Sequence, residues 1–117
     1  MKVYRKGTGE EYTPFNHFEM TTQAIFNTST GSDKVNVTLS TLKKGTGSSD
    51  EVHEHSDQVF YMIKGELLIY AKGELKETLT EGDAILVKAG DVHAVKNEKD
   101  EDCVYCAITV PPLPATH

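Results

Sequence analysis

Three histidines occupy positions from which their imidazole rings could bind one metal ion. His53 and His55 are two residues apart in a predicted strand, and alternate residues of a strand point to the same face. The strand rise places these two rings about 7 Å apart, within reach of a shared ion. His93 follows a glycine turn and begins another predicted strand, from which its ring could enter the same interior. Imidazole ligands suit zinc, iron, manganese or nickel, so the sequence predicts one divalent transition metal on His53, His55 and His93.

A site with three protein ligands has open coordination positions for water or substrate, which is typical of catalytic rather than structural metal sites. The alternative is a metal-free protein in which the histidines only form hydrogen bonds in the core. The other two histidines, His17 and His117, lie in irregular terminal segments, and we expect both to lie outside the site.

The elements that must position these histidines are short strands. From Thr21 onward, runs rich in Val, Ile, Leu, Tyr and Thr alternate with glycine or acidic turns, and convincing helical periodicity is absent. This pattern is typical of an all-β sandwich or barrel. The predicted strands are residues 23–27, 34–43, 52–55, 58–64, 66–71, 74–80, 84–88, 93–96 and 103–110. Residues 1–20 are predicted to be an arm on the barrel or on a second subunit, and residues 21–117 one barrel domain.

The predicted strand at 34–43 is amphipathic. Val35, Val37 and Leu39 share one face, and the intervening polar residues Asn36, Thr38 and Ser40 share the other. Such alternation predicts a half-buried strand, with the core on one definite side.

Two groups of residues resemble the sequence motifs of the cupin superfamily. The first group consists of Gly47, His53, Glu54, His55 and Gly65, with five residues between Gly47 and His53. The second group consists of Gly82, Gly90, His93 and Asn97. Both occur in the family's order, and the resemblance covers about residues 45–112. It implies a double-stranded β-helix (jelly-roll) barrel of the small single-domain kind, with a metal in its lumen and commonly a homodimer.

The chain departs from the family pattern at two positions. Counting back from Gly65, the family's glutamate ligand falls on Gln58, and the connection from His55 is shorter than usual. Gln58 offers a neutral amide oxygen, so we expect it either to be a fourth metal ligand or to form hydrogen bonds outside the ligand set. Asp57 is a weaker ligand candidate. Lys88 replaces the family's usual proline, which we expect to alter only a turn.

The two cysteines are not expected to form a metal knuckle or a redox pair. Cys103 and Cys106 lie within a single predicted strand, and residues three apart on a strand point to opposite faces. One sulfur is therefore predicted to face inward and the other outward.

Composition excludes several classes of partner. The chain has 117 residues, enough for one domain, and a formal net charge of −6 with no visible basic patch. Nucleic acid is therefore not an expected partner. No tract is apolar enough to span a bilayer, and no start resembles a signal peptide, so we expect a cytoplasmic protein that does not bind membranes.

The resemblance implies a metal-dependent enzyme acting on a small organic molecule, of the dioxygenase, decarboxylase, isomerase or lyase type. A non-catalytic cupin that binds or senses a small molecule or metal is the alternative, and fold does not decide between them. Tyr61 and Tyr105 are the candidate proton donors, whereas Glu54 is expected to face away from the histidines. Asn97 ends the second motif beside a loop, and we expect it to have a structural role.

Overall fold

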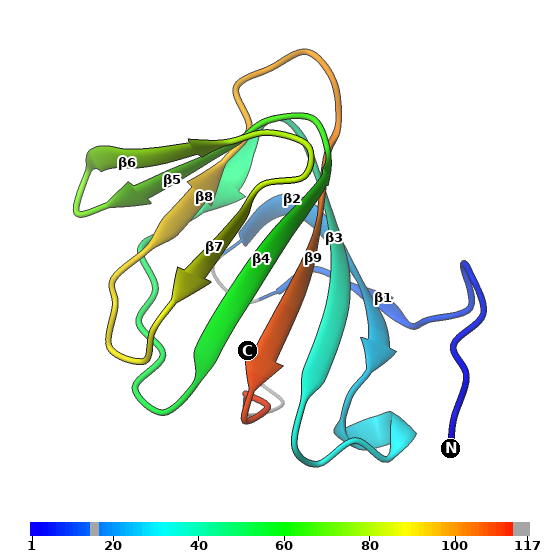
Figure 1. Ribbon diagram of the computed structural model, residues 1–117. Helices are drawn as coiled ribbons and strands as arrows, with labels where there is room; N and C mark the ends of the chain where they lie inside the picture. Colours follow the sequence, from blue (N-terminus) through cyan, green and yellow to red (C-terminus); the bar gives the residue numbers. More distant parts are fainter. Residues whose placement is uncertain (15–16, 114–117) are drawn as a thin grey trace.

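The computed structural model describes residues 1–14 and 17–113, without the side chains of residues 17–19. His117 lies outside the described residues, and His17 is described only as the backbone that begins a strand. A 3₁₀ helix, η1 (Thr28–Thr30), joins β2 to β3 (Figure 1). The strands of this part of the chain are β1 (Glu11–Tyr12), β2 (His17–Phe26), β3 (Asn36–Ser48), β4 (Asp57–Lys64), β5 (Leu67–Ala71), β6 (Glu74–Leu79), β7 (Ala84–Val87), β8 (Ala94–Lys96) and β9 (Cys103–Val110).

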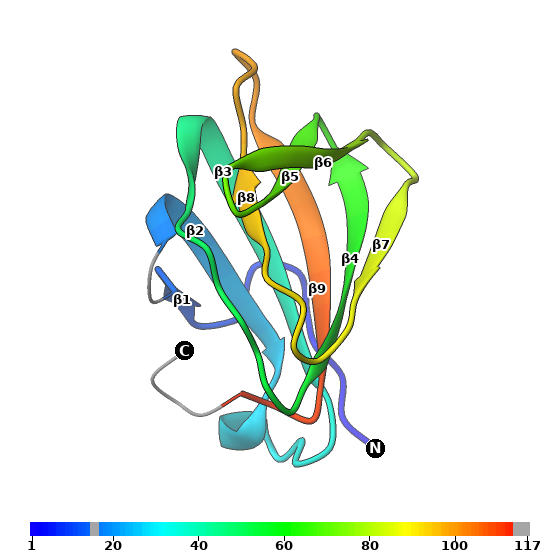
Figure 2. The same ribbon diagram turned by 90° about the vertical axis from the view of Figure 1, so that its left-hand side faces the viewer.

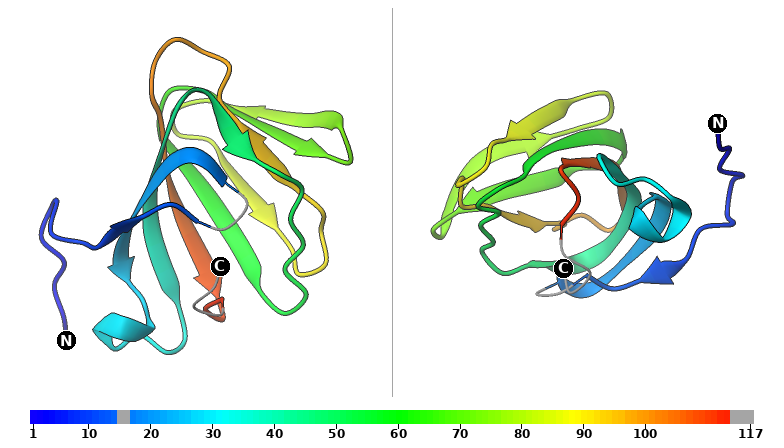
Figure 3. Two further views of the ribbon diagram at one scale, coloured as in Figure 1. Left: turned by 180° about the vertical axis from the view of Figure 1, so that it is seen from behind. Right: turned by 90° about the horizontal axis from the view of Figure 1, so that it is seen from below.

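The strands form an antiparallel jelly-roll barrel in which β3 belongs to both walls. One wall has the order β7-β4-β9-β3, with β2 on the other side of β3. The other wall has the order β6-β5-β8, and β8 pairs with the end of β3 at Gly47. The two walls curve around a common interior (Figure 3). The all-β barrel predicted from the sequence is therefore confirmed.

The predicted strands match the structure except at three places. β3 continues to Ser48, five residues beyond the end predicted at Lys43. Residues 52–55 do not form a strand, so the prediction of a strand there is wrong. Regular structure also begins earlier than Thr21, because β1 pairs with β2 and β2 begins at His17. The residues that precede β1 extend away from the barrel and return to η1, where Lys2 Nζ donates a hydrogen bond to the carbonyl oxygen of Thr30 (Figure 1).

The hydrophobic core fills one end of the barrel. Leu42 and Cys103 are paired across β3 and β9, and Met62 and Tyr105 are paired across β4 and β9. Leu67 of β5 packs with these residues from the opposite wall, and none of the five is more than 2% exposed. This end is a close-packed core, so the space inside the barrel is confined to the other end.

At the other end, the inward face of β3 is polar. Thr38 and Ser40 are 7% and 2% exposed, whereas Val37 and Leu39 on the alternate face are only partly buried. The apolar residues of this strand therefore face outward, the reverse of the usual arrangement in a half-buried strand. Polar side chains inside a barrel require hydrogen-bond partners, which indicates that this end of the interior is a binding cavity rather than a core.

Asn97 links the loop between β8 and β9 to β3, as expected for a structural role. Its side-chain amide nitrogen donates to the carbonyl oxygens of Leu42 and Glu101, each at 2.9 Å, and its oxygen accepts from the Lys99 backbone at 2.9 Å. Asn97 is fully buried, so these bonds satisfy a polar group that would otherwise be costly to bury.

The cysteines lie as predicted on opposite faces of β9. Cys103 is fully buried in the core, Cys106 is partly exposed on the outside, and neither forms a disulfide. Burial raises the pKa of the Cys103 thiol to about 12, and the nearby Glu66 carboxylate contributes to the shift. Cys103 is therefore a neutral apolar side chain of the core at physiological pH.

Within the described residues, the structure has no helix that is both long enough and apolar enough to cross a membrane.

Candidate metal centre

Two irregular connections bring the candidate site residues together. The connection between β3 and β4, residues 49–56, runs down the side of the barrel next to the connection between β7 and β8 (Figure 2). Backbone bonds join them, with Glu51 N to His93 O at 2.7 Å and His93 N to Glu51 O at 3.0 Å. Gly90 N also donates to His53 O at 2.9 Å. Residues about forty positions apart are thereby held side by side.

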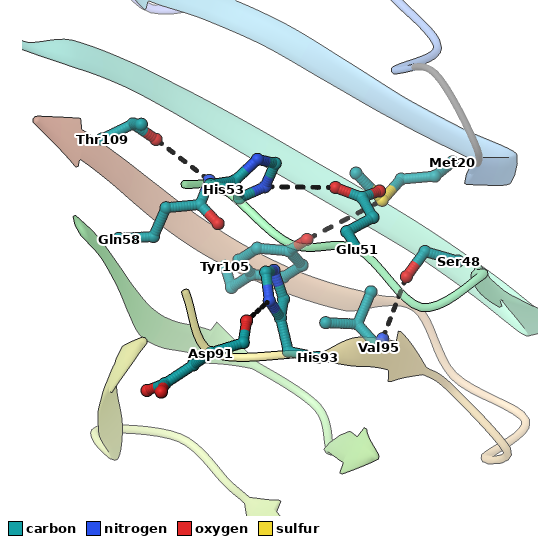
Figure 4. A network of polar contacts seen from close by, with 10 residues as sticks. All are labelled: Met20, Ser48, Glu51, His53, Gln58, Asp91, His93, Val95, Tyr105 and Thr109. Atoms are coloured by element: carbon teal, nitrogen blue, oxygen red, sulfur yellow. Dashed lines mark hydrogen bonds and ion pairs between the residues drawn. The ribbon is translucent and has the colours of Figure 1, made fainter. Parts of the chain in front are cut away.

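Glu51, His53 and His93 form a cluster of three potential metal ligands. One donor atom from each lies within 4.8 Å of the other two. His53 and His93 are 7% and 6% exposed, and their ring centroids are 5.3 Å apart. His53 Nε2 is 3.2 Å from Glu51 Oε2 (Figure 4). A largely buried carboxylate beside two buried imidazoles is a donor set that suits a divalent transition metal.

Gln58, the first residue of β4 to point inward, contributes an amide oxygen to the same cavity. Its Nε2 donates to Thr109 Oγ1 at 3.1 Å, which fixes the orientation of the amide (Figure 4). Among the described residues, its buried Oε1 accepts no hydrogen bond. A buried amide oxygen without a donor is unfavourable unless a ligand or metal ion interacts with it.

The hydrogen bond of His93 sets its tautomer in a way that suits metal binding. Its Nδ1 lies 3.1 Å from the carbonyl oxygen of Asp91. Because a carbonyl oxygen can only accept, Nδ1 carries a proton, and in the neutral form of such a ring Nε2 is the nitrogen that can bind a metal. Metal-binding histidines commonly have such an outer hydrogen bond.

Aromatic side chains enclose the cluster on the core side. The Phe60 ring is 6.0 Å from the His93 ring and 5.1 Å from the Tyr105 ring, measured between centroids. The Tyr105 hydroxyl donates a long hydrogen bond of 3.8 Å to Met20 Sδ. Burial raises the pKa of Tyr105 well above its ordinary value, and the Glu51 charge contributes to the increase. Tyr105 is therefore protonated and neutral, and its hydroxyl can donate a hydrogen bond beside the cluster.

The cluster faces a cavity of about 70 Å³ inside the barrel. Tyr12 and Pro14, which precede β2, and Leu113, which follows β9, line the cavity together with side chains from the barrel walls. Partial burial raises the pKa of Tyr12, and the Glu10 charge adds to the effect. Residues just before β2 and just after β9 thus contribute to the cavity.

The structure brings together some of the residues that the sequence singled out and separates others. His53, Gln58 and His93 line one cavity, but the His55 side chain is exposed. The same-face argument for His55 does not apply, because the segment around it is a bend rather than a strand. Asp57 is engaged elsewhere, since its Oδ1 accepts a hydrogen bond from Ala89 N at 2.8 Å.

The two candidate tyrosines lie on opposite sides of the barrel wall. Tyr105 lines the cavity, whereas Tyr61 is 49% exposed on the outer face of β4. Tyr61 therefore cannot donate a proton in the lumen, so the prediction of Tyr61 as a proton donor is wrong. Glu54 is exposed, as expected.

Glu51 was not among the ligands predicted from the sequence, although the spacing of the first motif contained a signal for it. Gly45 and Glu51 are separated by five residues, the same gap as between Gly47 and His53. If the first motif is aligned two residues earlier, Glu51 and His53 take the places first given to His53 and His55. The connection to Gln58 then lengthens from two residues to four. The unusually short connection from His55 was therefore a sign of the wrong alignment.

Comparisons with known proteins agree with this fold. A predicted oxalate decarboxylase from Thermotoga maritima superposes with a TM-score of 0.81 at 17% identity, covering 95% of this chain and 100% of that one. The polyketide cyclase RemF from Streptomyces resistomycificus superposes with a TM-score of 0.83 at 18% identity, covering 97% of this chain and 82% of that one. A sugar phosphate isomerase of the cupin superfamily from Silicibacter pomeroyi DSS-3 superposes with a TM-score of 0.77 at 16% identity, covering 96% of this chain and 76% of that one.

At these identities, the solved structures establish only the fold. No curated protein sequence matches the chain. The model of the cupin domain family matches residues 38–110, which run from within β3 to the end of β9 and include Glu51, His53, Gln58 and His93. The chain belongs to the cupin domain family.

Proposed function

We propose that the lumen binds one divalent transition metal and that the chain is a metal-dependent enzyme acting on a small organic molecule. The proposed ligands are Glu51, His53, Gln58 and His93. The observation that carries the proposal is the convergence of one carboxylate and two imidazoles within 4.8 Å in a buried position. The unpaired amide oxygen of Gln58 in the same cavity supports a fourth ligand.

The types of the proposed ligands limit which metals could bind and which reactions they could support. Two imidazoles with one carboxylate are typical of mononuclear iron and zinc sites that keep positions open for substrate. When bound, such a metal supplies Lewis-acid or redox chemistry. Manganese and nickel also accept these ligands. The solved structures with the same fold include proteins described as a decarboxylase, a cyclase and an isomerase, which is compatible with a dioxygenase, decarboxylase, isomerase or lyase reaction here.

The chain's own residues would bind, orient and protonate the substrate. Phe60 and Val95 line the cavity and exclude water from the cluster. Tyr105 is placed to donate a proton, because its present acceptor is the thioether of Met20, a weak one that a substrate oxygen would outcompete. Thr109 holds the Gln58 amide so that its oxygen faces the cavity.

The test of the metal site is a calorimetric titration of metal-stripped protein with zinc, manganese, nickel and, without oxygen, iron(II). We expect one site per chain, with affinity reduced about 100-fold or more in His53→Ala. His55→Ala is the matched control, since it removes an exposed imidazole from the same connection. Equal losses in both variants, or an unaffected His53→Ala protein, would contradict the proposed ligand set. Metal binding without turnover of any tested substrate would favour the alternative of a non-catalytic binding cupin.

We also propose that the protein is a homodimer that associates through the outer face of β7, β4, β9 and β3. These strands lie side by side in Figure 1. The outward side chains in the middle of these strands form an uncharged and largely apolar surface, here called the outer face, with Leu86 and Tyr61 exposed by 56% and 49%. The residues of the outer face are Val37, Leu39, Val59, Tyr61, Leu86, Cys106 and Ile108. A chain of net charge −6 can approach a second copy with least repulsion where its surface has no charge.

A further inference from the structure

The wall of the cavity formed by β2, β3 and β9 consists largely of short polar side chains. Register places Thr22 opposite Ser40 on β2 and β3, and Asn36 opposite Thr109 on β3 and β9. Thr38 lies between Asn36 and Ser40 on the same inward face of β3. We call these five residues the hydroxyl wall, and all of them line the same cavity as the proposed metal ligands.

The hydroxyl wall has hydrogen-bonding capacity that the protein does not use. Thr22 Oγ1 and Ser40 Oγ share one hydrogen bond of 2.9 Å, and Thr109 Oγ1 accepts from Gln58 while keeping its own proton to donate. Among the described residues, the buried Oδ1 of Asn36 accepts no hydrogen bond. Buried polar groups are almost always paired, so these donors and acceptors point to a ligand that has both.

The absence of cationic side chains from the described part of the cavity lining argues against an anionic group bound on the hydroxyl wall. No lysine or arginine is among the described residues that line the cavity, and Glu51 contributes a carboxylate. An anion held on the hydroxyl wall would lose its hydration without gaining an opposite charge from a side chain. A purely apolar ligand is also disfavoured, because it would leave the wall's buried polar groups without water or partners.

The small size of the cavity favours a ligand of a few carbon atoms. The cavity has a volume of about 70 Å³. It is open because the side chains at the level of Phe60 are small. Thr38 and Ala107 are paired in this layer, and Ala24 pairs with Thr38 from β2. Larger residues at these positions would fill the lumen, as Leu42 and Met62 do at the core end.

We propose that the cavity takes a small, neutral, polyhydroxylated molecule. One of its oxygens faces the cluster of Glu51, His53 and His93, and its other hydroxyl groups bind the hydroxyl wall. This inference rests on the proposed function, because the first oxygen is directed to the proposed metal. The remaining contacts depend only on residues of β2, β3 and β9.

The experiment compares three four-carbon probes by NMR titration of the zinc-loaded protein: erythritol, the erythronate anion and butan-1-ol. Erythritol is expected to bind most tightly, since it has a hydroxyl on every carbon and no charged group to desolvate against the hydroxyl wall. Thr38→Val and Asn36→Leu are each expected to weaken erythritol binding roughly three- to tenfold, the effect of losing one hydrogen bond. Thr41→Val, on the outward face of β3, is the matched control and should leave binding unchanged.

The outcomes separate this inference from the proposed function. If zinc binds with one site per chain but erythronate or butan-1-ol binds more tightly than erythritol, the polyol inference is overturned and the metal site stands. The polyol inference is also overturned if neither wall variant weakens erythritol binding. If zinc does not bind, the metal-free protein is titrated with erythritol. Binding that is weakened by Thr38→Val or Asn36→Leu would then support the hydroxyl wall alone, and no binding would overturn both proposals.

Discussion

At the scale of single residues, the site depends on where each donor atom is held rather than on which residues are histidines. His55 and His53 are identical in type and two positions apart, yet one is exposed and the other is buried beside His93. The difference arises because the connection between β3 and β4 is tied to His93 at Glu51 and to Gly90 at His53, and then turns away.

The orientation of Gln58 depends on Thr109, and this gives a prediction. Thr109→Val removes the acceptor of the Gln58 Nε2 hydrogen bond, so the amide oxygen is no longer fixed toward the cluster. We expect the affinity for zinc to fall about tenfold, since residues that orient metal ligands have effects of this size. Calorimetric titration measures the change, with Thr41→Val as the control. An affinity equal to that of the unchanged protein would show that Gln58 is not a ligand.

At the scale of the elements, most of the fold could be predicted from the sequence. Alternating apolar residues between glycine turns located the strands from β4 to β9 to within one residue, because strand periodicity and turn conformation are local properties. The segment around His53 could not be predicted in this way. Its conformation depends on backbone bonds to residues near position 90, and such contacts leave no local pattern.

The sequence also did not predict which face of β3 lies inside the barrel. Alternation defines two faces but does not say which one lies inside when the interior is a binding cavity. Thr38 and Ser40 face inward because the lumen is polar, while Val37 and Leu39 belong to the proposed dimer surface. The candidate site was therefore found in part. The two buried histidines and Gln58 were identified from the sequence, and Glu51 was missed.

The turns allow a prediction about stability at this scale. Gly45 and Gly65 have positive φ angles of 76° and 80°, but only Gly65 is closely packed. A Cβ at position 65 would lie 2.6 Å from the carbonyl oxygen of Asp102, whereas a Cβ at position 45 would meet nothing within 4 Å. Gly45→Ala should lower the free energy of unfolding by about 1 kcal/mol, from backbone strain alone. Gly65→Ala should lower it by about 3 kcal/mol, since the clash adds to the strain.

Urea unfolding of both variants and of the unchanged protein would measure these differences. Equal losses at the two positions would contradict the packing argument, because the two glycines differ mainly in their neighbours.

At the scale of the whole molecule, the inner and outer faces of the barrel have different proposed roles, ligand binding and association of two copies. The inner face is packed at one end and polar at the other, and the outer face of one wall is apolar. The proposed dimer predicts a mass of twice 12.9 kDa in sedimentation or light-scattering measurements. Tyr61→Glu places a charge on the outer face of each copy and should shift the protein to monomers.

Leu75→Glu is the matched control for the dimer, because Leu75 is 52% exposed on β6, away from the outer face. It should leave the mass unchanged. A monomeric mass for the unchanged protein, or a Tyr61→Glu protein that remains dimeric, would rule out association through this surface.

The central claim is that one metal ion binds between Glu51, His53, Gln58 and His93. The most direct measurement is an anomalous difference map from crystals grown with zinc, with data collected above and below the zinc absorption edge. We predict a single strong peak inside the barrel, in contact with the His53 and His93 rings and with the Glu51 carboxylate. A map with no peak in the lumen, or with its main peak beside the exposed His55, would contradict the account.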